Sequence, residues 1–182
     1  MKDKTCKACK CKFTPIRQFQ VVCNSYLCAI QYVNLSRTRQ NKKDISEYQK
    51  EKKERITALK TRSQWLKETQ IVYNLFIRTR DAGLNCISCD KPMFKKINAG
   101  HYRTVKAAPH LRFDERNCFA QCEACNTHLS GNIVNYRSNM IKRVGIEQVE
   151  AVERDNTAKH YSIDDIKDIK QFYKAKIKEL TK

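Results

Sequence analysis

Residues 86–132 read CISCDKPMFKKINAGHYRTVKAAPHLRFDERNCFAQCEACNTHLSGN and contain two cysteine pairs of the same spacing, Cys86-x2-Cys89 and Cys122-x2-Cys125. Two residues between ligands let both thiolates of a pair reach one ion from a tight turn, and two such turns complete a tetrahedral four-cysteine zinc site. Zinc has no redox chemistry, and a closed site leaves no open coordination position. We therefore expect a structural metal that contributes folding energy. Four buried thiols without a metal are the alternative.

Between and just after these pairs lie residues suited to phosphodiester hydrolysis. We place His101 in a short strand, Asn117 in the loop that follows, and Asn126 at the start of a helix. Hydrolysis needs a base that deprotonates water and a cation on the scissile phosphate. Neutral imidazole can be that base, and an asparagine can orient the histidine or ligate a hard cation. The order of His101, Asn117 and Asn126 resembles that of HNH nucleases, which implies that these three are catalytic residues of a ββα-metal unit.

The residue before His101 departs from that resemblance. Many HNH enzymes carry Asp or His there as a metal ligand, whereas this chain has Gly100. The catalytic cation, Mg²⁺ or Mn²⁺, must then find other ligands. Asn126 is the first candidate and His128 the second, although residues two apart on a regular helix point away from each other. Asp114 or Glu115 would contribute if their loop folds inward, and would otherwise belong to a solvated turn.

A closer resemblance covers nearly the whole chain, and short motifs between residues 61 and 132 carry it. They are Thr61–Trp65, Cys86–Cys89, Ala99–Thr104, Ala107–Pro109, Leu111–Phe113, Glu115–Asn117, Cys122–Asn126 and His128–Asn132. Together they resemble the NinG (Rap) recombination proteins of lambda-like phages. The resemblance implies a phage-encoded nuclease that cuts Holliday junctions and D-loops with a divalent cation, alongside phage or host recombination proteins. The cysteine frame is also similar, more distantly, to a zinc-stapled junction-resolving HNH nuclease of T-even phages.

A second, looser set of cysteines lies in residues 1–35 and predicts an N-terminal zinc-ribbon-like module with its own structural zinc. The four predicted ligands are Cys6, Cys9, Cys23 and Cys28. Cys11 is an alternative to Cys9. Otherwise Cys11 and Cys118 are spare thiols, because no adjacent base marks either one as a nucleophile.

The remaining segments complete a domain plan. Residues 36–62 form a basic linker, helical or flexible, with ten basic and four acidic residues and no Gly or Pro. Residues 63–132 form the nuclease domain, and residues 133–182 a helical region. The chain is thus predicted as a small zinc-stapled α+β protein: a zinc ribbon, a basic helical linker, and a ββα-metal unit flanked by helices.

Local signals place the elements of the last two domains. A leading helix over residues 63–82 begins at a Ser63 cap and ends before Gly83. Short strands are expected at 97–104 and 111–113, with a helix starting near Cys125. The last region is expected to form helices at 136–144 and 147–155, and a longer helix capped by Ser162.

Composition restricts the class of protein further. Among 182 residues, Lys and Arg number 37 and Asp and Glu 19, a formal charge of +18 that favours nucleic acid as the partner. Scarce Gly and Pro exclude collagen and low-complexity chains, and 41% hydrophobic residues exclude a wholly disordered one. No apolar run is long enough to cross a bilayer, and the charged N-terminus does not resemble a secretory signal. We expect a cytoplasmic protein in the host bacterium, where ten cysteines favour metal over disulfides.

The basic residues around His101 are candidates for contacts with DNA phosphates. They are Arg103, Lys106, Arg112 and Arg116. Each could equally belong to a solvated basic face. No base-reading pattern accompanies them, so we expect recognition of backbone and shape. Symmetric cutting of a junction needs two active sites, which makes a homodimer the expectation.

Two further functions stay open. A non-enzymatic accessory protein that binds branched DNA through its zinc modules would explain the charge and the glycine at position 100. A sequence-specific transcription regulator is a weaker alternative, because no helix-turn-helix pattern supports it.

Overall fold

The computed structural model describes residues 2–94 and 96–182, and the chain divides into two units, Met1–Lys60 and Thr61–Lys182. In the first unit, β1 (Lys4–Thr5) and β2 (Lys12–Phe13) form a small antiparallel hairpin. The 33-residue helix α1 (Tyr26–Ala58) follows, and nearly all of its side chains are exposed. α1 starts inside the predicted ribbon and runs through the predicted linker without a break at residue 35, because no Gly or Pro interrupts it.

The second unit begins with α2 (Arg62–Arg80), which starts one residue earlier than predicted. Its cap is Thr61 rather than Ser63: the Thr61 side chain accepts from the Gln64 backbone N–H, and the Gln64 side chain accepts from the Thr61 N–H. The helix ends at Arg80 with Asp81 as its cap, two residues before the predicted end, and Gly83 follows in the turn with φ +81°.

A two-stranded antiparallel sheet stands at the centre of this unit. β3 (Ile97–His101) pairs with β4 (Cys118–Cys122) so that His101 faces Cys118 and Gly100 faces Phe119. The strand predicted at 111–113 is wrong. Short 3₁₀ turns at Pro109–Leu111 and Glu115–Asn117 occupy this region, and the strand comes after them. The alternation of Leu111 and Phe113 reflects burial in two different cores, not strand pairing.

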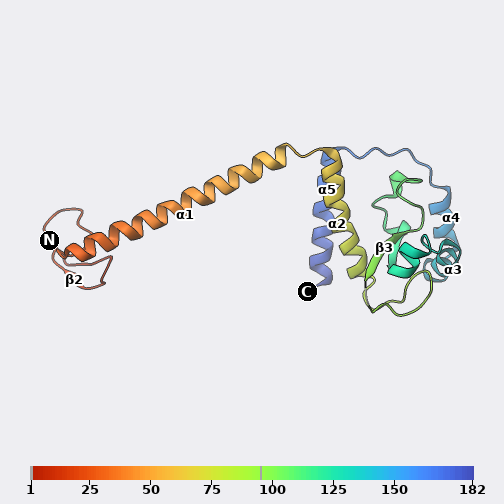
Figure 1. The fold of residues 1–182 in the computed structure, drawn as a ribbon, viewed down its shortest axis with the longest axis horizontal. Helices are drawn as coiled ribbons and strands as arrows, with labels where there is room; N and C mark the ends of the chain where they lie inside the picture. Colours follow the sequence, from red (N-terminus) through yellow and green to blue (C-terminus); the bar gives the residue numbers. More distant parts are fainter. Residues whose placement is uncertain (1, 95) are drawn as a thin grey trace. The chain divides into compact units, whose positions relative to one another are not determined.

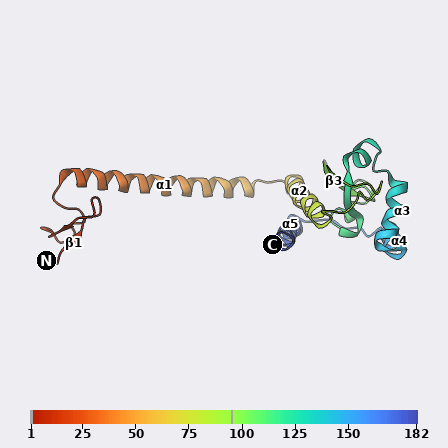
Figure 2. The ribbon, with the colours of Figure 1, turned by 90° about the horizontal axis from the view of Figure 1, so that it is seen from below.

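Helices cover the sheet on both sides (Figures 1 and 2). α2 and α5 (Ile163–Leu180) run parallel on one side, and α3 (Ile133–Val144) and α4 (Ile146–Arg154) lie on the other. Because neighbouring residues of a strand face opposite ways, Cys118 enters the core with α2 and α5, and Phe119 enters the core with α3 and α4. The predicted Ser162 cap is confirmed, since its side chain accepts from the Asp165 backbone N–H.

The segment after β4 differs from the expected regular helix. Residues Ala124–His128 form a single π-helical turn, in which the Leu129 N–H donates to the Ala124 carbonyl 3.0 Å away. Among the helices formed by the described residues, none combines the length and the apolar character required to span a bilayer.

Candidate functional site

The cysteine quartet of the second unit has the geometry of a zinc site. The sulfur atoms of Cys86, Cys89, Cys122 and Cys125 all lie within 4.8 Å of one another. A tetrahedral zinc with 2.3 Å bonds separates its sulfurs by about 3.8 Å, and the Cys89 and Cys122 sulfurs are 3.9 Å apart. The four thiols therefore fit zinc as predicted.

A tight turn prepares the first pair of this quartet for a metal. The Asp90 N–H donates to the Cys86 carbonyl at 2.9 Å, and Asp90 adopts a left-handed φ of +54°. The Cys122 N–H donates to the Cys86 sulfur at 3.3 Å. Burial raises the pKa of Cys86, but this N–H and those of Cys89 and Ser88 outweigh it and lower the pKa below its ordinary value. The turn thus favours the thiolate of Cys86, the form that binds zinc, whereas burial raises the pKa of Cys89.

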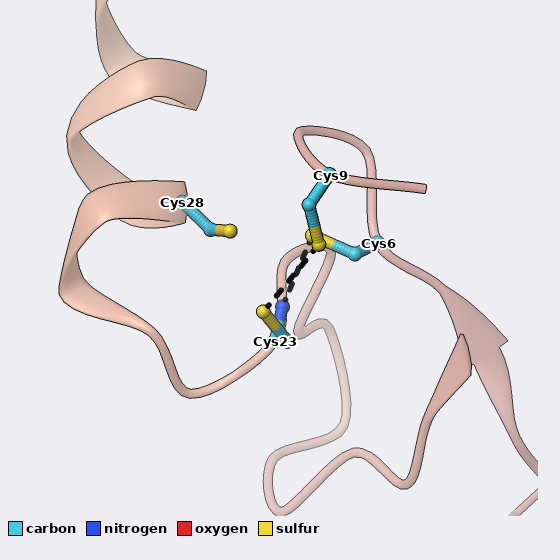
Figure 3. A group of neighbouring side chains, drawn as sticks. All are labelled: Cys6, Cys9, Cys23 and Cys28. Atoms are coloured by element: carbon cyan, nitrogen blue, oxygen red, sulfur yellow. Dashed lines mark hydrogen bonds between the residues drawn. The ribbon is translucent and has the colours of Figure 1, made fainter. Parts of the chain in front are cut away.

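The N-terminal quartet repeats this arrangement. Figure 3 shows Cys6, Cys9, Cys23 and Cys28 pointing toward one another, Cys28 from the first turn of α1, and their sulfurs also lie within 4.8 Å of each other. The turn between Cys6 and Lys10 matches the turn between Cys86 and Asp90. The Lys10 N–H donates to the Cys6 carbonyl at 3.0 Å, and Lys10 adopts a left-handed φ of +65°, as Asp90 does in the second unit.

The two remaining cysteines lie outside both quartets. Cys11 is exposed, with its sulfur 2.9 Å from that of Cys9, and Cys118 is fully buried in the core beside Tyr73. The geometry therefore selects Cys9 as the ligand. Burial raises the pKa of Cys118, so this thiol stays protonated and packs as an apolar side chain.

His101 is the last residue of β3, and its ring is held from two sides. Its Nε2 lies 2.9 Å from the Arg112 carbonyl oxygen, and its ring stacks on Tyr73 with centroids 6.0 Å apart. Because a carbonyl only accepts, Nε2 carries the proton in the neutral ring and Nδ1 carries the lone pair. Burial lowers the pKa of His101 below 6.5 despite this hydrogen bond. The neutral form, with a basic Nδ1, is therefore favoured at neutral pH.

Asn117 is fully buried, and both ends of its amide are occupied. Its Oδ1 accepts from the Arg103 N–H at 2.8 Å, and its Nδ2 donates to the Arg103 carbonyl at 3.0 Å and to the Leu111 carbonyl at 3.4 Å. The side chain thus ties the segment after β3 to the segment that carries the Arg112 carbonyl. All three hydrogen bonds of the Asn117 side chain thus go to backbone groups.

The structure gives a steric reason for glycine at position 100, and the sequence alone does not reveal it. A Cβ built on Gly100 would overlap the Gln121 Oε1 and would stand 3.2 Å from the Asn126 Oδ1. Two hydrogen bonds of 2.6 Å fix the Gln121 amide, from its Nε2 to the Ser88 hydroxyl and to the Gly131 carbonyl. The amide oxygens of Gln121 and Asn126 therefore converge where a side chain at position 100 would lie.

The other predicted cation ligands lie elsewhere. His128 is exposed at the end of the π turn. Asp114 pairs with Arg116 at 2.6 Å, and Glu115 pairs with Lys176 at 2.6 Å. Apart from the two cysteine quartets, the described residues contain no group of three or more His, Cys, Asp or Glu at metal-binding distances. The possible cation ligands beside Gly100 are thus the amide oxygens of Gln121 and Asn126, and of these two residues only Asn126 was predicted from the sequence.

The four predicted DNA contacts separate into two kinds. Arg103 donates to the carbonyls of Val152 and Asp155 at the end of α4, and Arg116 is engaged by Asp114, so both hold the fold together. Lys106 is exposed, and Arg112 is half-buried with its Nε donating to Gln70.

Besides Gln121, three further residues that shape this site were not predicted from the sequence. Arg80 donates to the Cys118 carbonyl at 2.9 Å, and Asp81 accepts from the Ala120 N–H at 2.7 Å, so this pair covers the outer edge of β4. Tyr136 donates its hydroxyl proton to the Gly100 carbonyl at 2.8 Å. A polar Arg-Asp pair directly after an apolar helix face was the only available signal, and Tyr136 offered none.

Comparison with known proteins identifies the family of this chain. The family model described as "Bacteriophage Lambda NinG protein" matches residues 1–182. The chain belongs to the NinG family. It is 48% identical over 126 residues to the protein ninG of Salmonella phage P22 and to that of Escherichia phage lambda, and 47% identical to that of Escherichia phage 933W.

These alignments cover 69% of this chain and 62% to 63% of each relative, so the chain matches less than two thirds of the length of these relatives. No solved structure is similar to it. The expected membership of the NinG family is confirmed.

Proposed function

We propose that this NinG-family chain is a metal-dependent DNA endonuclease that cuts branched recombination intermediates, such as Holliday junctions and D-loops, with His101 as the general base. The observation that carries the proposal is the Arg112 carbonyl at 2.9 Å from Nε2, which leaves Nδ1 of a neutral imidazole as the proton acceptor. Because burial lowers the pKa of His101, the base is ready at neutral pH.

His101 would act on a water molecule beside the scissile phosphate. Nδ1 takes a proton from this water as its oxygen forms a bond to phosphorus, and the bond from phosphorus to the 3′ oxygen breaks. A bound Mg²⁺ or Mn²⁺ would supply charge stabilisation for the phosphate and the leaving oxygen. Asn126 would hold the cation through its amide oxygen, with Gln121 beside it, and Asn117 keeps the Arg112 carbonyl in position.

Charge supports DNA as the substrate. About +11 of the net +18 lies in residues 1–62, and most of this segment is the exposed helix α1. Such a helix contributes phosphate contacts without sequence information. Lys106 and Arg112 remain the candidates for contacts near His101. In the reducing cytoplasm of a host cell, the quartets would keep their zinc. A homodimer would bring two copies of His101 to one junction, and recombination proteins of phage or host would be its partners.

Cleavage of a synthetic four-way junction tests the proposal. The zinc-loaded chain should cut the junction with Mg²⁺ or Mn²⁺ and spare a linear duplex, and His101→Ala and His101→Asn should abolish cutting. His160→Ala is the matched control, because His160 is an exposed histidine in the loop between α4 and α5. If both His101 variants cut the junction as well as the wild type, His101 is not the general base.

The second candidate is a non-enzymatic protein that holds branched DNA for other recombination enzymes. The absence of a carboxylate or histidine cluster beside His101, within the described ranges, favours it. It predicts junction binding with a steep salt dependence and no nicking with any divalent metal. The metal-dependent cleavage assay separates the two candidates, whereas binding does not.

A further inference from the structure

A pocket of about 350 Å³ lies beside α5, and His101 is not among its lining residues. Its walls come from three segments that are far apart in sequence: the stretch between the two 3₁₀ turns, the loop before α5, and α5 itself. The side chains that matter for its chemistry are Phe113, Lys159, Tyr161, Asp168, Phe172 and Tyr173.

Buried aromatic rings form the floor of this pocket, and hydrogen bonds fix them. The Tyr173 hydroxyl donates to the Phe113 carbonyl at 2.9 Å, and the Tyr161 hydroxyl donates to the His110 carbonyl at 2.6 Å. The rings of Phe113 and Tyr161 meet edge to face with centroids 5.4 Å apart. Because both hydroxyl groups are already engaged, the floor is rigid and presents ring surface rather than unpaired polar atoms.

Phe172 forms an open wall of the pocket. It is 53% exposed although it is a large apolar side chain, and its ring meets Tyr173 at a centroid distance of 5.2 Å in an edge-to-face contact. Two ammonium groups stand nearby: Lys159 Nζ lies 5.0 Å from the Tyr161 centroid, and Lys176 Nζ, which is paired with Glu115 at 2.6 Å, lies 4.8 Å from the Phe172 centroid. An aromatic wall flanked by cations is the combination that binds a flat ring carrying a phosphate.

We propose that this pocket binds one unpaired nucleotide of a DNA substrate, with its base stacked on Phe172. The Lys159 ammonium group contacts an adjoining phosphate, Lys176 stays paired with Glu115 beside the ring, and the Asp168 carboxylate accepts a hydrogen bond from a base amino group. The inference deepens the proposed function and rests on it, since branched DNA offers unpaired or unstacked bases at its crossover.

The size and charge of the pocket favour a nucleotide over a second copy of the chain. A stable protein interface buries upward of about 1,000 Å² with several apolar side chains at its centre, whereas Phe172 is the one strongly exposed aromatic residue lining this pocket. Lys159, at the rim of the pocket, also suits a polyanion.

Two consecutive residues, Arg112 and Phe113, link this pocket to His101, the proposed general base. Phe113 forms part of its floor, and the carbonyl of the preceding residue, Arg112, holds His101 Nε2. Tyr73 lies between them, stacked on His101 and edge to face with Phe113 at 5.6 Å. A base captured on Phe172 would therefore fix the position of its strand relative to His101, which gives selectivity for DNA structure without reading sequence.

A fluorescent base tests this inference with the full zinc-loaded chain and no added Mg²⁺ or Mn²⁺. One duplex carries 2-aminopurine as a single unpaired bulge, and a second carries it fully paired. The variant is Phe172→Ala, and the matched control is Leu180→Ala, since Leu180 lies on the same helix and is 52% exposed. Stacking should quench the bulged base in the wild-type chain. Phe172→Ala should bind bulged DNA about tenfold more weakly, Leu180→Ala should not, and all three should bind the paired duplex equally.

Other outcomes would contradict either the nucleotide pocket or the proposed nuclease activity, and the two cases can be told apart. Equal affinities of Phe172→Ala and Leu180→Ala for bulged DNA would overturn the pocket, and the nuclease would stand if both variants still cut junctions. A dimer that Phe172→Ala converts to a monomer in light scattering would also overturn it, because a second copy would then occupy the pocket. Quenching on Phe172 in a wild-type chain that cuts no junction would support the pocket and remove the nuclease.

Discussion

Removal of the Asn117 amide should lower the free energy of unfolding of the second unit by a measurable amount. The substitution Asn117→Ala leaves the Arg103 N–H and carbonyl without the partners that stand at 2.8 and 3.0 Å. Each backbone group that loses its partner in a buried setting costs about 1–3 kcal/mol, so we expect the free energy of unfolding to fall by about 3 kcal/mol. Domains of this size are stable by about 5–15 kcal/mol, and the variant should therefore remain folded at 25 °C.

Urea unfolding with excess zinc measures this loss, because the single tryptophan, Trp65, lies in the core of the same unit and reports its unfolding. Asn135→Ala is the matched control: Asn135 is exposed on α3, and its hydrogen bond at 2.9 Å goes only to Asn132. The control should stay within about 0.5 kcal/mol of the wild type. A loss below about 1 kcal/mol for Asn117→Ala would show that this side chain does not hold the loops around His101.

Three further results are expected. Gly100→Ala should lower the free energy of unfolding by about 1–3 kcal/mol through overlap with Gln121. The loss should be clearly smaller when Gln121 is also replaced by alanine, and equal losses in urea titrations would contradict the overlap. Because burial lowers the pKa of His101, protonation should reduce single-turnover cleavage only below pH 6.5, and a midpoint at or above that value would argue against this base. Cys9→Ser should lower bound zinc from two ions per chain to one, whereas Cys11→Ser should leave two; metal analysis after dialysis decides between Cys9 and Cys11.

Local signals in the sequence predicted the elements whose chemistry is local. The cysteine pairs around Cys86 and Cys122 act within tight turns, and both quartets assemble as expected. The capping box at Ser162 and the glycine after α2 were also readable, because a cap depends on residues three or four positions away. Such features need no knowledge of the tertiary fold.

Features that depend on distant contacts escaped the sequence. The segment around Leu111 has the apolar pattern of a strand, yet each of its apolar residues packs into a different core and the backbone turns instead. Arg103 looked like a phosphate contact, but it donates to carbonyls about 50 residues away at the end of α4. Neither fact follows from periodicity or charge, because both require the position of α4 relative to the sheet.

The structural zinc and the candidate site are linked through one buried side chain. Gln121 donates to the Ser88 hydroxyl, between the first two cysteines of the quartet, and to the Gly131 carbonyl that follows the last one. These bonds aim its Oε1 at Gly100, next to His101, and beside the Asn126 amide. Because Ser88 lies between two cysteines of the quartet and Asn126 directly follows the last one, a zinc ion bound there would hold the two amide oxygens in place without taking part in chemistry. A side chain at position 100 would have to displace Gln121 from these hydrogen bonds, which gives a physical reason for glycine at this position.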